Sequence, residues 1–213
     1  PDRTHFLGSD ERNNLCGNLN INPSAYDEVF NAVIDETDLE EIFQRFNTVG
    51  HPLYRGYSLS VSDVVVTEKG AFFCDSISFK SIEFDETKAQ KPSDMMKIVY
   101  KEPGKPAFET EIPNHYKDLS KAVKGLLETV YNGDNTIIVC NEEGKLIGMK
   151  GNIHLDNGTS IIAGPFFVCG DDGENFRGLT DEETEKYLKK YAEPEDISDD
   201  ETQSDVGFTI VGM

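Results

Sequence analysis

The stretch IIAGPFFVCGDDGENF, Ile161–Phe176, carries a strong strand signal in the second half of the chain. Gly164 and Pro165 divide its apolar residues into two short runs, and an acidic segment with a further glycine follows. Apolar runs of this length between glycine and proline are typical of buried strands that end in turns. We therefore predict one or two core strands here, with a bend at Gly164-Pro165 and a turn over residues 170–173.

Cys169 ends the second apolar run, and two interpretations of it are open. A reactive thiol needs a cation or a helix N-terminus to lower its pKa, whereas Asp171, Asp172 and Glu174 follow closely and would raise it. The prediction is a buried core residue. We expect free buried thiols, rather than disulfides or a zinc site assembled from distant segments, for the other cysteines as well. These are Cys16, Cys74 and Cys140.

The residues before this stretch predict a hairpin, a helix and a further strand. MMKIVYKEPGKPAFETEI, residues 95–112, is typical of two strands joined by a Pro-Gly turn. HYKDLSKAVKGLLETVY, residues 115–131, has apolar residues at helical spacing and predicts one amphipathic helix. NTIIVCNEEGKLIG, residues 135–148, predicts a strand, a turn and a short second strand. The apolar face of the helix consists of Leu119, Val123, Leu126, Leu127 and Val130.

The residues after it predict a helix and an acidic tail. In TDEETEKYLKKY, residues 180–191, Thr180 and Glu183 form a capping box, and acids at the start with lysines at the end suit the helix dipole. EPEDISDDETQSD, residues 193–205, contains seven acids and is predicted to be disordered. The last residues, GFTIVGM at 207–213, suit either an edge strand or a trailing end.

The first half changes from helical to strand patterning. In DETDLEEIFQRFN, Thr37 and Glu40 indicate a capping box, and the apolar spacing predicts a helix of about ten residues that ends near Gly50. SLSVSDVVVTEKGAFFCDSISF, residues 58–79, predicts a hairpin around a Glu-Lys-Gly turn. Its serines are expected on a solvated strand face, the alternative being a triad that lacks a nearby base. They are Ser58, Ser60 and Ser62.

Together these patterns predict an α+β protein with two small domains, each a short antiparallel sheet packed on one or two helices. The first domain is expected over residues 1–85, a polar linker over 86–95 and the second domain over 96–192. The acidic tail, with its terminal strand if one forms, occupies 193–213. A chain of 213 residues is long enough for two such cores.

The net charge bounds the choice of partners. With 40 acids against 20 Lys and Arg, the formal charge is −20, which argues against direct contact with nucleic acid or an anionic membrane. A protein partner with a basic surface is consistent with this charge. The acids can serve capping and solubility, or they can form a partner-binding surface that imitates the phosphates of DNA. The candidate residues are Asp35, Glu36, Asp38, Glu40, Glu41, Asp171, Asp172 and Glu174.

No motif predicts catalysis, a metal or a cofactor, so we expect a non-enzymatic protein. EPGKP lacks the frame of a phosphate-binding loop. The alternative of a module that sequesters a nucleotide or signalling molecule would need clustered lysines. Apolar runs are too short to cross a membrane, and the N-terminal residues lack the apolar core of a secretory signal, so we expect a cytoplasmic protein. The candidate lysines are Lys97, Lys101 and Lys105, or Lys145 and Lys150.

Two groups of motifs resemble known families. FN…HP…RGYSLSVSDVVV with the F-x-C-DS-x-x-F strand, within about residues 36–85, resembles the YodL-like domain. The EPGKP hairpin, CNEEGK turn, IAGPFF strand and final helix, within about 96–192, resemble an uncharacterised domain-of-unknown-function family. Neither resemblance implies a catalytic residue. Both imply a protein of phages or other mobile elements, in the company of antirestriction proteins. An anti-defence inhibitor (antirestriction or anti-CRISPR-like) and an accessory domain without a defence role are both consistent with that company.

Overall fold

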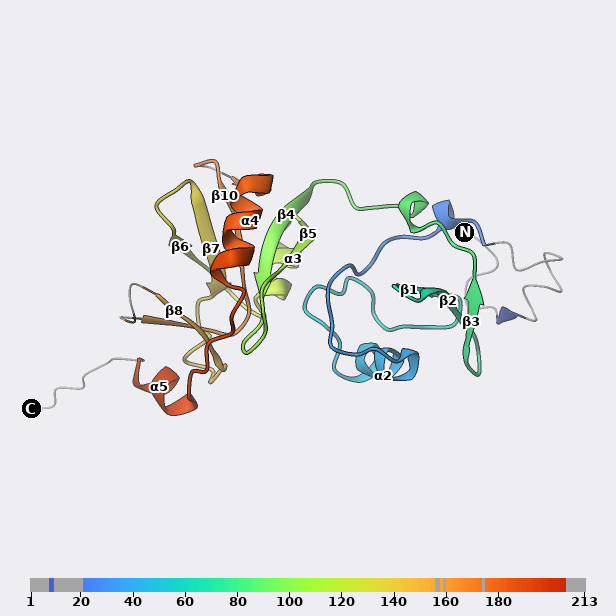
Figure 1. Cartoon of the computed structure of the whole chain (residues 1–213), viewed down its shortest axis with the longest axis horizontal. Coiled ribbons are helices and arrows are strands. Elements are labelled where there is room, and N and C mark those ends of the chain that lie inside the picture. Colours follow the sequence, from blue (N-terminus) through green and yellow to red (C-terminus); the bar gives the residue numbers. More distant parts are fainter. Residues whose placement is uncertain (1–7, 10–20, 156–157, 159, 174, 206–213) are drawn as a thin grey trace, which may run out of the picture. The chain divides into compact units, whose positions relative to one another are not determined.

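The computed structural model describes residues 8–9, 21–155, 158, 160–173 and 175–205. The chain divides into two compact units (Figure 1). Unit 1 comprises residues 1–30 and 34–92, and unit 2 comprises 31–33 and 93–213. Each unit contains antiparallel sheet packed with helices, which confirms the predicted α+β class.

In the described part of unit 1, a small sheet packs against the helix Leu39–Thr48. The predicted hairpin is present, and Gly70 adopts a φ of 124° after its turn, a conformation that glycine tolerates without strain. Ile42 and Phe46 of the helix pack with Tyr54 and with Val65 of the sheet. The elements are η1 (Pro23–Ala25), α2 (Leu39–Thr48), β1 (Val64–Thr67), β2 (Gly70–Cys74), β3 (Phe79–Ile82) and η2 (Glu86–Lys88).

Two local predictions in unit 1 are wrong. The N-cap of α2 is Asp38 rather than Thr37, since the Asp38 carboxylate accepts a hydrogen bond from the Glu40 backbone N–H at 2.8 Å. A charged carboxylate also interacts favourably with the helix dipole. The serine segment before β1 forms turns instead of a solvated strand face. Ser62 is buried with a φ of 82°, and its backbone N–H donates to the Cys74 carbonyl at 2.9 Å.

Unit 2 is built around one antiparallel sheet in the order β5-β4-β10-β7-β6, with β11 paired to β10 and a separate β8–β9 hairpin. The stretch Ile161–Phe176 supplies β10, which lies between β4 and β7, and every residue from 161 to 170 is buried. The strands are β4 (Met95–Lys101), β5 (Phe108–Pro113), β6 (Leu127–Tyr131), β7 (Thr136–Asn141), β8 (Gly151–Leu155), β9 (Ser160–Ala163), β10 (Phe166–Asp171) and β11 (Phe176–Arg177). The helices are α3 (Tyr116–Ala122), α4 (Asp181–Lys190) and α5 (Asp199–Ser204).

Other elements of unit 2 cover both faces of its sheet. Successive strand residues point to opposite faces, so Tyr100 and Val99 contact different elements. On one face the Tyr100 hydroxyl donates to the Ala122 carbonyl of α3 at 3.0 Å. On the other face, Val99 and Val168 belong to a core cluster with Tyr187 of α4 and Ile153 of β8. Burial on two faces explains why the central strands read as continuous apolar runs instead of alternating patterns.

The predicted helix over 115–131 is wrong beyond Ala122. Lys124 has a φ of 62°, and a Cβ at Gly125 would lie 2.3 Å from the side-chain nitrogen of Asn141. The chain therefore reverses here, and residues 127–131 pair with β7 as strand β6. Of the predicted apolar face, Leu119 and Val123 are buried beside the sheet, whereas Leu126 is exposed and Leu127 and Val130 belong to the strand.

Residues 142–148 form turns, so the predicted short strand over 145–148 is also wrong. A Cβ at Gly144 would lie 2.5 Å from the Ala163 carbonyl oxygen, and this close approach accounts for glycine at the turn. The acid-rich segment 193–205 is ordered rather than disordered. It contains α5, and Ile197 and Thr202 are each only 1% exposed. The predicted terminal strand, 207–213, lies outside the described residues.

Candidate functional site: a charged groove beside α4

The predicted acidic surface divides between the two units. Four of its residues at the start of α2 are exposed: Asp35, Asp38, Glu40 and Glu41. Glu36 accepts a hydrogen bond from Arg45 at 2.6 Å. Burial is the largest single influence on the pKa of Glu36 and raises it. The hydrogen bond from Arg45, a backbone hydrogen bond and the charge of Arg45 together outweigh burial and hold the pKa below its ordinary value.

The remaining predicted acids belong to unit 2. Asp171 is half-buried and accepts a hydrogen bond from the Gly173 backbone N–H at 2.9 Å, so it shapes the turn after β10. Asp172 is exposed, and Glu174 lies outside the described residues. Neither unit by itself therefore contains the whole predicted surface.

The predicted lysine clusters are largely occupied by partners from the chain itself. Lys101 is completely buried, its ammonium donates to the Lys105 carbonyl at 2.7 Å, and burial lowers its pKa. Lys105 lies 3.0 Å from Glu102, and Lys145 lies 2.7 Å from Asp205. Lys150 is exposed. These contacts pair the ammonium groups of Lys101, Lys105 and Lys145 with other groups of the chain.

The three described cysteines are buried and free, as predicted. Cys169 is completely buried, and burial, followed by the charge of Asp171, raises the pKa of its thiol to about 12, with Arg177 opposing. Cys74 and Cys140 are also buried and free, with pKa values raised by burial to about 11 and about 12. Cys16 lies outside the described residues.

The motif residues of the two families likewise support the fold. Asn141 of the CNEEGK turn is buried, and its amide donates to the carbonyls of Val123 and Lys124 at 3.2 and 2.9 Å. In unit 1, Asn47 follows Phe46 and donates to the Leu59 carbonyl at 3.0 Å. These side chains join segments distant in sequence, so their roles here are structural.

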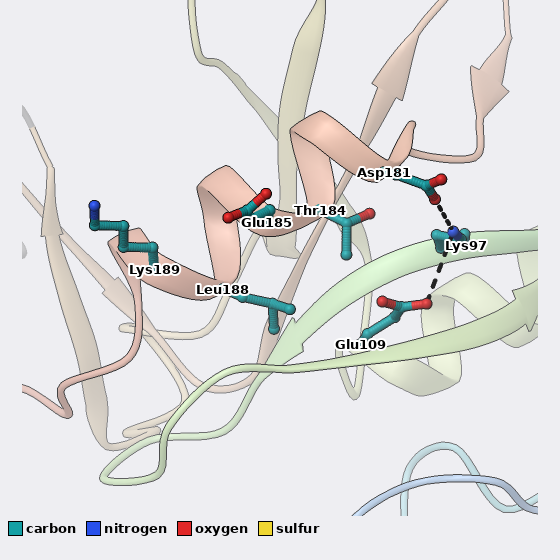
Figure 2. A pocket seen from close by; sticks show the side chains of 7 residues that line it. All are labelled: Lys97, Glu109, Asp181, Thr184, Glu185, Leu188 and Lys189. Carbon is teal, nitrogen blue, oxygen red and sulfur yellow. Dashed lines mark hydrogen bonds and ion pairs between the residues drawn. The ribbon is translucent and has the colours of Figure 1, made fainter.

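A groove of about 480 Å³ lies between α4 and the β4–β5 hairpin (Figure 2). Thr184 and Leu188 project from α4 toward the hairpin and provide its inner wall. The capping box at Thr180 and Glu183 sets the start of α4, which places Asp181 at the mouth. The lining residues are Lys97, Glu109, Asp181, Thr184, Glu185, Leu188 and Lys189.

Lys97 is surrounded by carboxylates. Its ammonium lies 2.7 Å from Asp181 and 3.8 Å from Glu109, and Glu111 is its register partner on β5. The hydrogen bond to Asp181 comes first among the causes that raise the pKa of Lys97, and Lys97 in turn lowers the pKa of Asp181. Asp181 is 93% exposed, so solvent screens this pair and it adds little to stability.

The groove is lined by charged side chains together with Thr184 and Leu188. It combines exposed carboxylates with the apolar side chain of Leu188, and this combination suits the charged head and aliphatic stem of a lysine or arginine. No group of three or more His, Cys, Asp and Glu side chains in the described part of the chain is arranged to hold a metal.

Sequence reasoning missed the groove and one further polar cluster. Lys97 and Asp181 are 84 positions apart, and only the packing of α4 beside β4 brings them together. His154 lies between Glu195 at 2.5 Å and Glu201 at 3.0 Å. A signal for the second cluster was available in Ile197, an aliphatic residue within an otherwise polar segment.

Among the described helices, none is long and apolar enough to cross a membrane.

Comparison with protein families places this geometry in context. The model of the YodL-like domain matches residues 2–84, and the model of a domain of unknown function, DUF3846, matches residues 96–192. The two matches follow one another along the chain, first the YodL-like domain and then DUF3846. The predicted order of the two domains is confirmed, and the YodL-like match extends further toward the N-terminus than the motifs do. The groove and the His154 cluster therefore belong to the DUF3846 part and its C-terminal extension. No curated protein and no solved structure matches the chain.

Proposed function

We propose that this chain is a non-enzymatic acidic binding protein of a phage or other mobile element. Its partner is a host nucleic-acid-handling protein, which it binds through that protein's basic surface. By this binding the chain acts as an anti-defence inhibitor. The observation that carries the proposal is the groove beside α4, where three carboxylates outnumber two ammonium groups. The carboxylates are those of Glu109, Asp181 and Glu185, and the ammonium groups are those of Lys97 and Lys189. The overall charge of −20 supplies a long-range field that attracts a cationic partner.

The proposed contact places a lysine or arginine of the partner in the groove. Its aliphatic stem packs on Leu188, and its charged head meets Glu109 and Glu185, which are both exposed. Acids elsewhere on the surface contribute through the summed field, as phosphates do along DNA. The internal pairing of the lysines supports this proposal over nucleotide sequestration.

A competition experiment tests the proposed function. The immobilised full chain is incubated with host lysate, and bound proteins are challenged with duplex DNA or with rising salt. We expect DNA to release the captured protein and recovery to fall steeply with salt, because contacts between charged surfaces are screened. A captured protein that resists both treatments would contradict binding at a DNA-binding surface.

Charge-matched variants locate the contact. Glu109→Gln combined with Glu185→Gln removes two exposed groove carboxylates, and we expect about tenfold weaker binding of the captured partner. The control, Glu142→Gln combined with Glu143→Gln, removes the same charge from exposed acids of the turn after β7. An equal loss in both pairs would mean that net charge, and not the groove, governs binding.

A further inference from the structure

The acid-rich segment 193–205, hereafter the strap, is docked on the β8–β9 hairpin of unit 2. Ile197 and Thr202 are each 1% exposed and lie over Gly151 at the start of β8. A Cβ at Gly151 would lie 2.6 Å from Ile197 Cγ2 and 2.6 Å from Thr202 Oγ1. The fit of the strap therefore depends on a residue without a side chain at position 151.

Near one end of the strap, His154 of β8 binds two strap carboxylates; the part of unit 2 outside the strap is called the body below. His154 Nδ1 lies 2.5 Å from Glu195 Oε2, and Nε2 lies 3.0 Å from Glu201 Oε1. The His154 backbone N–H also donates to Glu195 at 3.1 Å. The hydrogen bonds to Glu195 and then Glu201 raise the pKa of His154. They favour the imidazolium form, in which Nδ1–H donates to Glu195 and Nε2–H donates to Glu201.

At the other end, a lysine of the body binds the third carboxylate. Asp205 Oδ2 accepts from Lys145 Nζ at 2.7 Å, from the Ile161 backbone N–H at 2.8 Å and from Ser160 Oγ at 3.4 Å. The Gln203 amide donates to the Lys145 carbonyl at 3.3 Å. Two cationic side chains of the body thus meet three of the strap's carboxylates.

The strap's conformation depends on this docking. Its helix, α5, has 6 residues, and a helix this short is unstable in water without tertiary contacts. Its remaining acids face solvent even in the docked state, which leaves them accessible to another molecule. They are Glu193, Asp196, Asp199 and Asp200.

We propose that the strap is a detachable acidic ligand that His154 and Lys145 hold in cis, and that a basic partner displaces them and takes over the carboxylates of Glu195, Glu201 and Asp205. This inference rests on the proposed function, because it assumes a basic partner. The two cations of the body act as internal substitutes for that partner's lysines and arginines. Docking then lowers the apparent affinity for the partner, because only molecules with a released strap bind fully.

Two variants test the proposal without changing the charge of the full chain. Gly151→Val fills the space above Gly151 that Ile197 and Thr202 occupy, hereafter the notch. Ile197→Ala removes the apolar side chain of the strap that lies in this notch. We expect faster hydrogen exchange over residues 195–204 in both variants. We also expect binding to a short arginine-rich peptide to tighten by about tenfold, because the fraction of competent molecules rises. The matched control is Ile147→Ala, at an aliphatic residue of unit 2 that is 58% exposed, and both quantities should stay at wild-type values.

The outcomes separate this inference from the proposed function. If Gly151→Val releases the strap and peptide affinity is unchanged, the inference is overturned while the proposed function stands. If the strap stays protected in both variants, docking through the notch is refuted. If neither wild type nor variants bind the peptide, and the chain captures no basic protein from the lysate, the proposed function is refuted, and the inference that rests on it is refuted as well. Adding Glu195→Gln, Glu201→Gln and Asp205→Asn to Gly151→Val should abolish the gain in affinity, and a gain that persists would also overturn the inference.

Discussion

Removal of the hydroxyl from each of two stacked tyrosines of unit 2 should have different effects on the free energy of unfolding. Tyr187 and Tyr191 lie with ring centroids 6.0 Å apart near the end of α4, and both are buried. The Tyr187 hydroxyl lies 2.6 Å from Thr136 Oγ1 and 3.0 Å from Asp134 Oδ2. The Tyr191 hydroxyl is buried and has no hydrogen-bond partner among the described residues. Substitution by phenylalanine removes one oxygen from each.

The expected magnitudes follow from those contacts. A hydrogen bond to a charged group contributes about 1.5–3 kcal/mol, but Asp134 keeps its contacts with Thr136 and Lys186 when the Tyr187 hydroxyl is removed. We therefore expect Tyr187→Phe to lower the free energy of unfolding by about 1–2 kcal/mol. Tyr191→Phe removes a desolvated hydroxyl without losing a bond, so it should leave stability unchanged or raise it by about 1 kcal/mol.

Urea unfolding followed by circular dichroism measures both effects. The chain contains no tryptophan, so tryptophan fluorescence cannot show which unit unfolds. Hydrogen exchange of peptides from β7 and β10 therefore assigns the transition to unit 2. Each variant is compared with wild type at the same pH and ionic strength. Equal losses from Tyr187→Phe and Tyr191→Phe would refute the reasoning, because the hydrogen-bond partners would then not determine the cost.

Three further predictions address the strap, the start of α4 and the thiols. Because its two carboxylate partners raise the pKa of His154 above 6.5, the contact supports docking fully below that pH and is lost as the pH rises through the raised pKa. Strap protection, corrected for intrinsic exchange, should therefore fall at alkaline pH. The fall should persist in the control His115→Gln and be absent in His154→Gln, and protection independent of pH in wild type would contradict the assignment. Thr180→Ala removes the N-cap bond to Glu183 and should cost about 1 kcal/mol in urea unfolding, whereas a loss below a few tenths would show that the Arg177–Glu183 pair holds this end alone. The buried thiols should react with iodoacetamide at neutral pH only after unfolding, and rapid labelling of the native chain, read by mass spectrometry of each cysteine peptide, would contradict their burial. These thiols are Cys74, Cys140 and Cys169.

Local sequence was sufficient where the deciding contacts lie within a few residues. The capping box at Thr180, the hairpin turn before Gly70 and the two strands around Gly164-Pro165 each depend on neighbours in the chain. The buried state of Cys169 followed from the apolar residues beside it. The family motifs were sufficient for the order of the two domains.

Local sequence failed where one pattern suits two structures. The residues after Ala122 have helical spacing and also strand-forming Thr129 and Val130, and strand β6 forms because Gly125 must pass close to Asn141 of β7. Backbone pairing with β7, the next strand along the chain, outweighs the local helix preference, since propensity differences are only fractions of a kcal/mol per residue.

The composition determined that this protein carries a large excess of carboxylate, but only the tertiary structure decided which carboxylates have partners. Asp181 meets Lys97 across 84 positions, and Asp205 meets Lys145 across 60. The order of the strap was likewise decided by Gly151, which lies far from Ile197 in sequence and beside it in the fold. Charge and hydrophobicity are properties of residues, whereas pairing and burial are properties of positions in space, and long-range packing alone brings those positions together.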